Sequence, residues 1–222
     1  MENNKFTDYL RLEKPTDKLQ EHLNGVNILQ RSMAIHPERK LILFKPGKCA
    51  GTSIFRTNLQ PMGGWVVHKD NPELFNNWLQ NITDEELDSY FTFIFCRNPF
   101  NRLVSVWNDT DKLGINSPTS GIGKYSDFKE FVKKGVPFNG LAGKGVPTQL
   151  HYQLQTSLFE TPDKSKRYIS FVGKIENIQE DWKRLCNLIQ IPYKPITHTK
   201  QKIHFPHTTL YDEEAKNIIA PS

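Results

Sequence analysis

Residues 41–53 read LILFKPGKCAGTS, and they carry the strongest structural signal of the chain. Its first four residues are all apolar, which predicts a short, buried strand of a parallel sheet. The strand runs into a loop that combines glycines, one lysine and two hydroxyls: Gly47, Lys48, Gly51, Thr52 and Ser53. Backbone N–H groups, the N-terminus of a following helix and a lysine together favour an anion, so the stretch predicts a phosphate-binding loop.

The spacing of this loop differs from that of the nucleoside triphosphatases. Their loop reads GxxxxGK[ST], with lysine directly before the hydroxyl that holds magnesium. Here Lys48 precedes Gly51 by three residues. A triphosphatase also places an aspartate at the end of a neighbouring apolar strand, whereas the apolar stretch 91–96 is followed by Arg97. Because an arginine binds phosphate and not a cation, the pattern favours a second phosphate group over a metal.

Two motifs together resemble the signatures of the sulfotransferase family, in its carbohydrate and membrane-associated branch: KCAGTS at 48–53 and RNPFNRLVS at 97–105. The family's first motif, usually PKxAGTS, binds the 5′-phosphosulfate of 3′-phosphoadenosine 5′-phosphosulfate (PAPS). The second, usually RNPxxRxxS, binds its 3′-phosphate. The resemblance implies that these residues bind the donor: Gly47, Lys48, Cys49, Ala50, Gly51, Thr52, Ser53, Arg97 and Ser105. The family's proline is Gly47 here, and Arg102 is as compatible with an ordinary surface arginine as with a phosphate ligand.

The resemblance continues along the chain and implies the family's fold. Residues 171–189 resemble its later strand and helix, and residues 210–219 resemble its C-terminal helix. The implied fold is a single α/β domain in which helices flank a central parallel sheet, similar to the P-loop nucleotide hydrolases. Alternation of apolar strands with helical segments points to the same class, and 222 residues suffice for one such domain.

Several further elements are predicted from local patterns. A short strand is expected at 65–67, followed by a helix that Asp70 or Asn71 caps and that carries Pro72 in its first turn. Other helices are expected over 102–107 and 126–133.

The domain boundaries follow changes in composition. Residues 1–39 are polar and mixed, and we interpret them as an N-terminal arm or a cap on the sheet, with the sulfotransferase domain spanning 40–222. Residues 109–147 are rich in glycine and proline, which predicts a loop region. We interpret it as the acceptor side of the site, with an inert surface excursion as the alternative.

Sulfuryl transfer requires that the acceptor oxygen lose a proton and that charge on the leaving phosphate be neutralised. Lys48 suits the second task. For the proton we choose His68, twenty residues beyond Lys48, where many relatives place a histidine. His151 is the second candidate, and with Gln155 it is interpreted as an acceptor contact. The carboxylates that remain open as alternative bases are Glu73, Glu85 and Glu86.

Composition agrees with a nucleotide partner. The formal net charge is +5, which favours an anionic donor and an acceptor such as an acidic sugar without the charge density typical of nucleic-acid binding. Three widely spaced cysteines predict neither a disulfide framework nor a metal cluster, and suggest a reducing compartment. The N-terminus lacks an apolar signal-type core and no long apolar run occurs, so we expect a soluble, cytoplasmic protein without a membrane span. A removed N-terminal anchor is compatible with the same sequence.

These observations predict a PAPS-dependent enzyme that transfers a sulfuryl group to an acceptor hydroxyl, most of all on a carbohydrate, with PAPS as co-substrate and no metal. Two alternatives stay open. One is a magnesium- and ATP-dependent small-molecule kinase of related fold, and the other is a non-catalytic nucleotide-binding scaffold.

Overall fold

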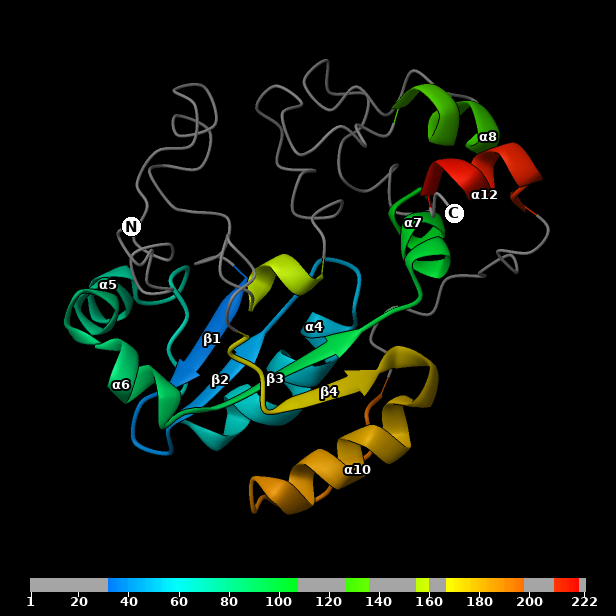
Figure 1. Ribbon diagram of the computed structural model, residues 1–222. Helices are drawn as coiled ribbons and strands as arrows, with labels where there is room; N and C mark the ends of the chain where they lie inside the picture. Colours follow the sequence, from blue (N-terminus) through cyan, green and yellow to red (C-terminus); the bar gives the residue numbers. More distant parts are fainter. Residues whose placement is uncertain (1–31, 108–126, 136–154, 160–166, 198–209, 220–222) are drawn as a thin grey trace.

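A four-stranded sheet lies at the centre of the computed structural model, which describes residues 32–107, 127–135, 155–159, 167–197 and 210–219 (Figure 1). The strands follow one another in space in chain order: β1 Met33–His36, β2 Leu41–Phe44, β3 Phe91–Cys96 and β4 Phe171–Lys174. Strands β2, β3 and β4 are parallel, as the sequence predicts. Strand β1 is antiparallel to β2 and pairs Met33 with Phe44.

Strand β1 changes two expectations. It lies inside the stretch 1–39 that the sequence suggests as an arm or a cap, so the sheet begins before residue 40. It also makes the sheet mixed, with an antiparallel strand at one edge. The predicted strand at 65–67 is reduced to a single bridge, in which Val66 pairs with Ile35 of β1.

Two helices cover one face of the sheet. Helix α5 Pro72–Asn81 begins as predicted, because the side chain of Asn71 accepts a hydrogen bond from the Leu74 N–H at 3.1 Å. Helix α6 Asp84–Asp88 follows and leads into β3. The core of this face combines alternate residues of β2 and β3 with the inner side of both helices: Ile42, Phe44, Phe75, Leu79, Leu87 and Ile94.

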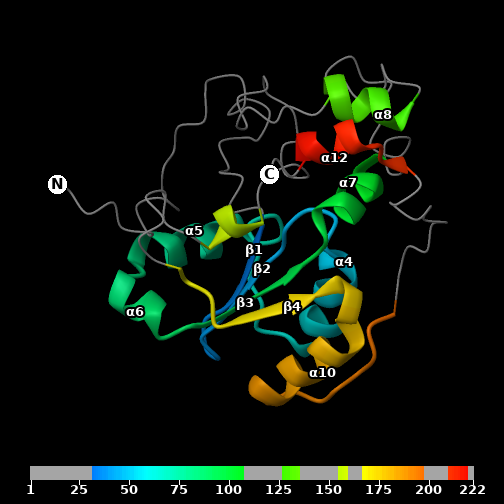
Figure 2. The same ribbon diagram turned by 45° about the vertical axis from the view of Figure 1, so that its right-hand side comes forward.

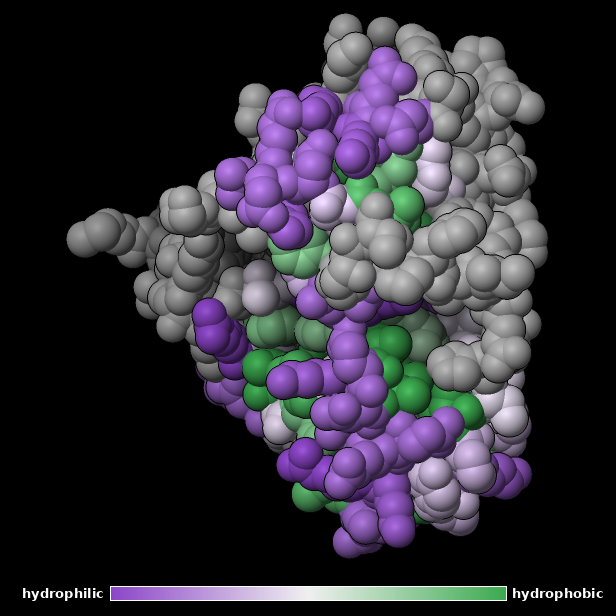
Figure 3. Space-filling model, turned by 90° about the vertical axis from the view of Figure 1, so that its right-hand side faces the viewer, coloured by the Kyte–Doolittle hydropathy of each residue, from purple (hydrophilic) through white to green (hydrophobic). Residues whose placement is uncertain are grey.

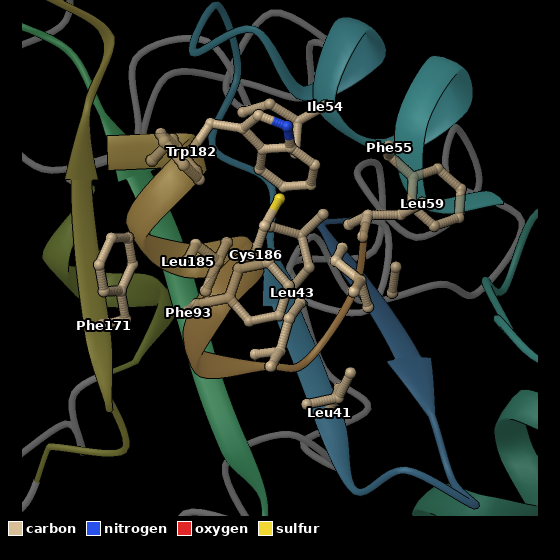
Figure 4. Close-up of a cluster of buried hydrophobic side chains, with 14 of the residues drawn as sticks. Leu41, Leu43, Ile54, Phe55, Leu59, Phe93, Phe171, Trp182, Leu185 and Cys186 are labelled. Atoms are coloured by element: carbon tan, nitrogen blue, oxygen red, sulfur yellow. The ribbon is translucent and has the colours of Figure 1, made fainter. Parts of the chain in front are cut away.

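The opposite face of the sheet is covered by helices from two distant parts of the chain. Helix α4 Gly51–Ile54 continues into the π-helical turn η1 Phe55–Leu59 and then η2 Gln60–Met62, while α10 Ile178–Leu188 follows β4 and the short turn η7 Ile175–Asn177. Figure 4 shows how side chains of α10 meet those of the strands and of α4–η1: Leu41, Leu43, Ile54, Phe55, Leu59, Phe93, Trp182, Leu185 and Cys186.

A third group of helices gathers beyond the carboxyl end of β3 (Figures 1 and 2). Helix α7 Pro99–Trp107 packs there with α8 Phe128–Glu130, the turn η5 Phe131–Gly135 and α12 Glu213–Ile219. The Tyr211 hydroxyl donates to the carbonyl of Phe100 at 3.1 Å and ties the start of α12 to α7. The helix predicted at 126–133 is therefore present as one α-helical turn followed by a π-helical turn. A further 3-10 turn, η6 Thr156–Leu158, packs on the face covered by α5.

The molecular surface is mostly polar where α10, α12 and β4 face the viewer. Figure 3 shows hydrophilic residues over much of the described part of this face, with hydrophobic residues visible in patches among them. Val172 of β4 and Leu188 of α10 are among the large hydrophobic residues that are exposed.

Strand β4 has room for no side chain at Gly173. A Cβ at this position would lie 2.4 to 2.9 Å from three atoms of the Phe95 ring, which is itself buried between Phe171 and Trp182. We expect Gly173→Ala to lower the free energy of unfolding by about 1–3 kcal/mol, because the packed ring cannot move aside. Urea denaturation measures this, and Val172→Ala on the exposed side of the same strand is the control. An unchanged midpoint for Gly173→Ala would contradict the packing.

Candidate functional site

The sheet brings the two predicted phosphate-binding segments to one edge. Strands β2 and β3 are parallel neighbours, so the loop after Phe44 and the turn after Cys96 leave the sheet on the same side. Ligands of open α/β sheets bind at this carboxyl edge. Helix α6 precedes β3 and therefore lies at the opposite edge of the sheet. It carries Glu85 and Glu86, so these two carboxylates are too far from Lys48 to serve as bases there.

The phosphate-binding loop carries two residues in the left-handed conformation, and neither is a glycine. Lys48 has φ of 66°, and Ala50 has φ of 53° and ψ of 19°. Cys49 lies between them, and its N–H closes a turn onto the carbonyl of Pro46 at 3.3 Å. Left-handed residues that alternate with others form the backbone concavities that bind anions, and each such residue costs on the order of 1 kcal/mol. The backbone strain in the loop thus falls on Lys48 and Ala50 and not on the glycines.

Two arginines bind the carbonyl side of this loop. The Arg97 Nη1 donates to the carbonyl of Lys48 at 3.4 Å, and the Arg102 Nε donates to the carbonyl of Gly47 at 2.9 Å. Arg102 is only 7% exposed, so the interpretation of it as a surface arginine is wrong. Helix α7 turns this side chain inward, and burial lowers the pKa of both guanidinium groups from an ordinary value far above neutrality. The loop and the second motif therefore form one connected structure.

Gln155 joins the same structure through its side-chain amide. Its Oε1 accepts from the Arg97 N–H at 2.8 Å and from the Cys49 thiol at 3.2 Å, and its Nε2 donates to the Arg97 carbonyl at 2.9 Å. The carboxamide is thus bound at both ends by protein atoms. This geometry differs from that of the acceptor contact that the sequence suggested.

The turn after Arg97 is held by polar groups that flank it. The Asn98 Oδ1 accepts from the N–H groups of Phe100 and Asn101 at 2.9 and 3.3 Å, which caps the start of α7. The Glu176 Oε1 accepts from the Asn98 N–H at 2.8 Å. Glu176 lies in η7 after β4, and the sequence does not predict its role because its partner is a backbone group of a distant segment.

The hydroxyl residues of the two motifs occupy different environments. Thr52 is exposed, whereas Ser53 is buried in α4 and its carbonyl accepts from the Thr57 hydroxyl and from the Asn58 Nδ2. Ser105 lies on α7 and is buried. Its role in binding a 3′-phosphate stays a prediction from the resemblance.

The candidate bases are placed less closely. His68 is half-buried after the Val66 bridge, and its ring meets the edge of Phe75 with centroids 5.7 Å apart. Glu73 lies exposed in the first turn of α5. His151 lies outside the described residues. The structure thus leaves His68 as a prediction.

Lys45 is a charged residue whose burial the sequence did not predict. It follows β2 directly, and its Nζ lies 4.7 Å from the centroid of the Phe55 ring. Burial lowers the pKa of Lys45 to about 8, the carboxylate of Asp70 acts in the opposite direction, and the charge of Arg56 lowers the pKa further. Alternation along the strand was the available signal, because Leu41, Leu43 and Lys45 point to the same buried face.

The lowered pKa of Lys45 predicts a dependence of stability on pH. The folded protein releases this proton near pH 8 and the unfolded chain near 10.5, so the unfolded state binds more protons between these values and stability rises with pH there. Lys45→Met keeps the contact with Phe55 but has no proton to release. We expect its stability advantage over the wild type to shrink by roughly 1–3 kcal/mol between pH 8 and 10.5.

Urea denaturation of both proteins at several pH values measures the difference in their free energies of unfolding. Groups that titrate alike in both proteins cancel from this difference. NMR titration of the Lys45 side chain gives the pKa directly. A difference that stays constant over this range, or a pKa of Lys45 near 10.5, would contradict the burial of the ammonium group.

Within the described residues, no helix is both long and apolar enough to cross a membrane, and no three His, Cys, Asp or Glu side chains group as metal ligands would. Searches of curated proteins and of solved structures gave no match. The model of the sulfotransferase family matches residues 32–220, which include both motifs and all four strands. The chain therefore belongs to the sulfotransferase family.

Proposed function

We propose that this protein transfers a sulfuryl group from PAPS to a hydroxyl of a carbohydrate acceptor. The observation that carries the proposal is the direct link between the two phosphate-binding segments. Arg97 donates to the carbonyl of Lys48, so the loop for one phosphate and the arginine for the other lie side by side at one sheet edge. A donor with phosphates on both the 5′ and the 3′ positions suits this pair of sites.

The proposed reaction is an in-line displacement at sulfur. The acceptor oxygen forms a bond to sulfur as the bond from sulfur to the bridging oxygen of the donor breaks, and the electron pair of that bond stays with the nucleotide. Adenosine 3′,5′-bisphosphate leaves, and the acceptor proton passes to a base. Lys48 stabilises the charge that grows on the leaving oxygen, because an ammonium group beside the 5′-phosphate interacts most strongly when that charge is largest.

We propose His68 as the base. Imidazole titrates near neutrality, which suits a base. His68 lies two residues after Val66, which pairs with Ile35 of β1, and its ring packs against the ring of Phe75. Two features support a carbohydrate acceptor. The motifs resemble those of the carbohydrate branch of the family, and the net charge of +5 favours an acidic sugar.

The function is tested in two steps. Calorimetric titration with adenosine 3′,5′-bisphosphate, and separately with ATP and magnesium, identifies the nucleotide; tight binding of the bisphosphate alone is expected. Transfer of labelled sulfate from PAPS to a panel of glycans, phenols and peptides then identifies the acceptor. Binding of magnesium ATP in place of the bisphosphate would make the protein a kinase. Bisphosphate binding without transfer to any acceptor class would favour a scaffold.

His68→Ala is the variant that tests the base. It is expected to bind adenosine 3′,5′-bisphosphate with wild-type affinity and to lose transfer by about 10²–10⁴-fold. The control is His36→Ala, because His36 is the last residue of β1 and packs against the ring of Trp65. Equal turnover of His68→Ala and the wild type would move the role to another residue, with His151 the next candidate.

A further inference from the structure

Gln155 pairs with Arg97 in the way that a residue of a neighbouring strand would. One side-chain amide accepts from the N–H and donates to the carbonyl of the same residue, at 2.8 and 2.9 Å. In an antiparallel sheet, two opposite residues exchange the same pair of hydrogen bonds. Arg97 stands one residue past the end of β3 and past Cys96, the last residue that pairs with β4. The side-chain amide of Gln155 therefore continues the backbone hydrogen bonding of β3 by one residue, to Arg97.

The same amide also reaches the phosphate-binding loop. Its Oε1 accepts a second hydrogen bond, from the Cys49 thiol at 3.2 Å. Burial raises the pKa of Cys49 to about 12, so the sulfur keeps its proton at neutral pH and remains a donor. Gln155 thus binds one residue from each of the two phosphate-binding segments.

The position of Gln155 is itself well anchored. Leu158 and Phe159 follow it within four residues and are buried in the core beside the sheet. The Phe159 ring lies 6.5 Å from the ring of Phe44, the last residue of β2. The amide is therefore fixed to the same strand that delivers the loop.

We propose that Gln155 is a positioning residue of the donor site, which sets the direction of the Arg97 guanidinium by holding the Arg97 peptide and Cys49 together. This deepens the proposed function and rests on it, since Arg97 is assigned there to the 3′-phosphate. It replaces the interpretation of Gln155 as an acceptor contact, because both ends of its amide are already bound by protein atoms.

The test uses Gln155→Met, which keeps the length of the side chain and removes every hydrogen bond. Calorimetry compares its affinity for adenosine 3′,5′-bisphosphate with that for adenosine 5′-monophosphate, which lacks the group that Arg97 binds. We expect about a tenfold loss for the bisphosphate and little change for the monophosphate. In the Arg97→Ala background, Gln155→Met should cause no further loss, because the side chain that Gln155 directs is gone.

Gln179 provides a matched control. Its amide also binds both backbone groups of one residue, accepting from the Ile196 N–H at 3.1 Å and donating to its carbonyl at 2.7 Å, after α10. Gln179→Met should lower the free energy of unfolding about as much as Gln155→Met does. It should leave the affinities for the bisphosphate and the monophosphate unchanged.

Two results would overturn the proposal. One is an unchanged bisphosphate affinity of Gln155→Met, which together with a raised KM for the acceptor would return Gln155 to the role of an acceptor contact. The other is an equal loss in the Arg97→Ala background. Hydrogen exchange of the Arg97 amide separates this failure from that of the function. It should accelerate in Gln155→Met whichever nucleotide binds, whereas a wild-type protein that ignores the bisphosphate contradicts the donor assignment itself.

Discussion

Lys48→Ala is expected to lower the rate of sulfuryl transfer by about 10²–10³-fold, comparable to the loss of a donor in an oxyanion hole. The reason is the position of Lys48 in the left-handed turn of the phosphate-binding loop, where its charge faces the nucleotide's leaving oxygen in the proposed reaction. Single-turnover measurements with PAPS give the chemical step, and calorimetry with adenosine 3′,5′-bisphosphate gives the affinity. We expect the rate to fall by more than the affinity.

The control for Lys48→Ala is Lys40→Ala. Lys40 also adopts a left-handed conformation, with φ of 50°, and lies in the turn between β1 and β2 at the opposite edge of the sheet. Its substitution carries the same backbone change but should leave transfer intact. Equal rates for Lys48→Ala and Lys40→Ala would remove Lys48 from the chemistry.

Arg97→Ala is expected to weaken binding of adenosine 3′,5′-bisphosphate by about 10–100-fold, the contribution of charge-assisted hydrogen bonds to one phosphate. The turn itself should survive the substitution. Gln155 and Glu176 hold it through backbone groups of residues 97 and 98, which alanine retains. The loss should therefore appear mainly as a raised KM for PAPS.

Calorimetry with the bisphosphate and with adenosine 5′-monophosphate measures the effect of Arg97→Ala. The monophosphate should bind both proteins with similar affinity. Arg184→Ala is the control, because Arg184 is an exposed arginine of α10 that pairs with Asp181. A uniform loss for both nucleotides in Arg97→Ala would place Arg97 at the 5′-phosphate instead.

The elements that the sequence predicts well are those whose pattern is local. The runs 41–44 and 91–96 are apolar throughout, and the structure places β2 and β3 at these residues and pairs them in parallel. Helix α5 starts at Pro72 because Asn71 and Pro72 are adjacent start signals. Strand β1 is missed because its four residues, MAIH, lie next to a mostly polar stretch and include a histidine, and the pairing with β2 that makes them extended comes from another segment.

The details of the site depend on contacts between distant segments. Arg102 is buried because the loop carbonyl of Gly47 lies against α7, a relation that no local pattern contains. Arg102 is part of the motif at 97–105, but the motif does not predict whether its side chain faces the loop or the solvent. Gln155 follows the same logic, since its partners Cys49 and Arg97 are 106 and 58 residues away.

The arginines behind the phosphate-binding loop have an electronic consequence. The carbonyl of Gly47 and the N–H of Lys48 belong to one planar peptide group and point in opposite directions. The Arg102 Nε bonded to that carbonyl draws electron density toward the oxygen, which makes the N–H on the other side a stronger donor. Through this one amide, Arg102 can strengthen the Lys48 N–H as a donor to an anion.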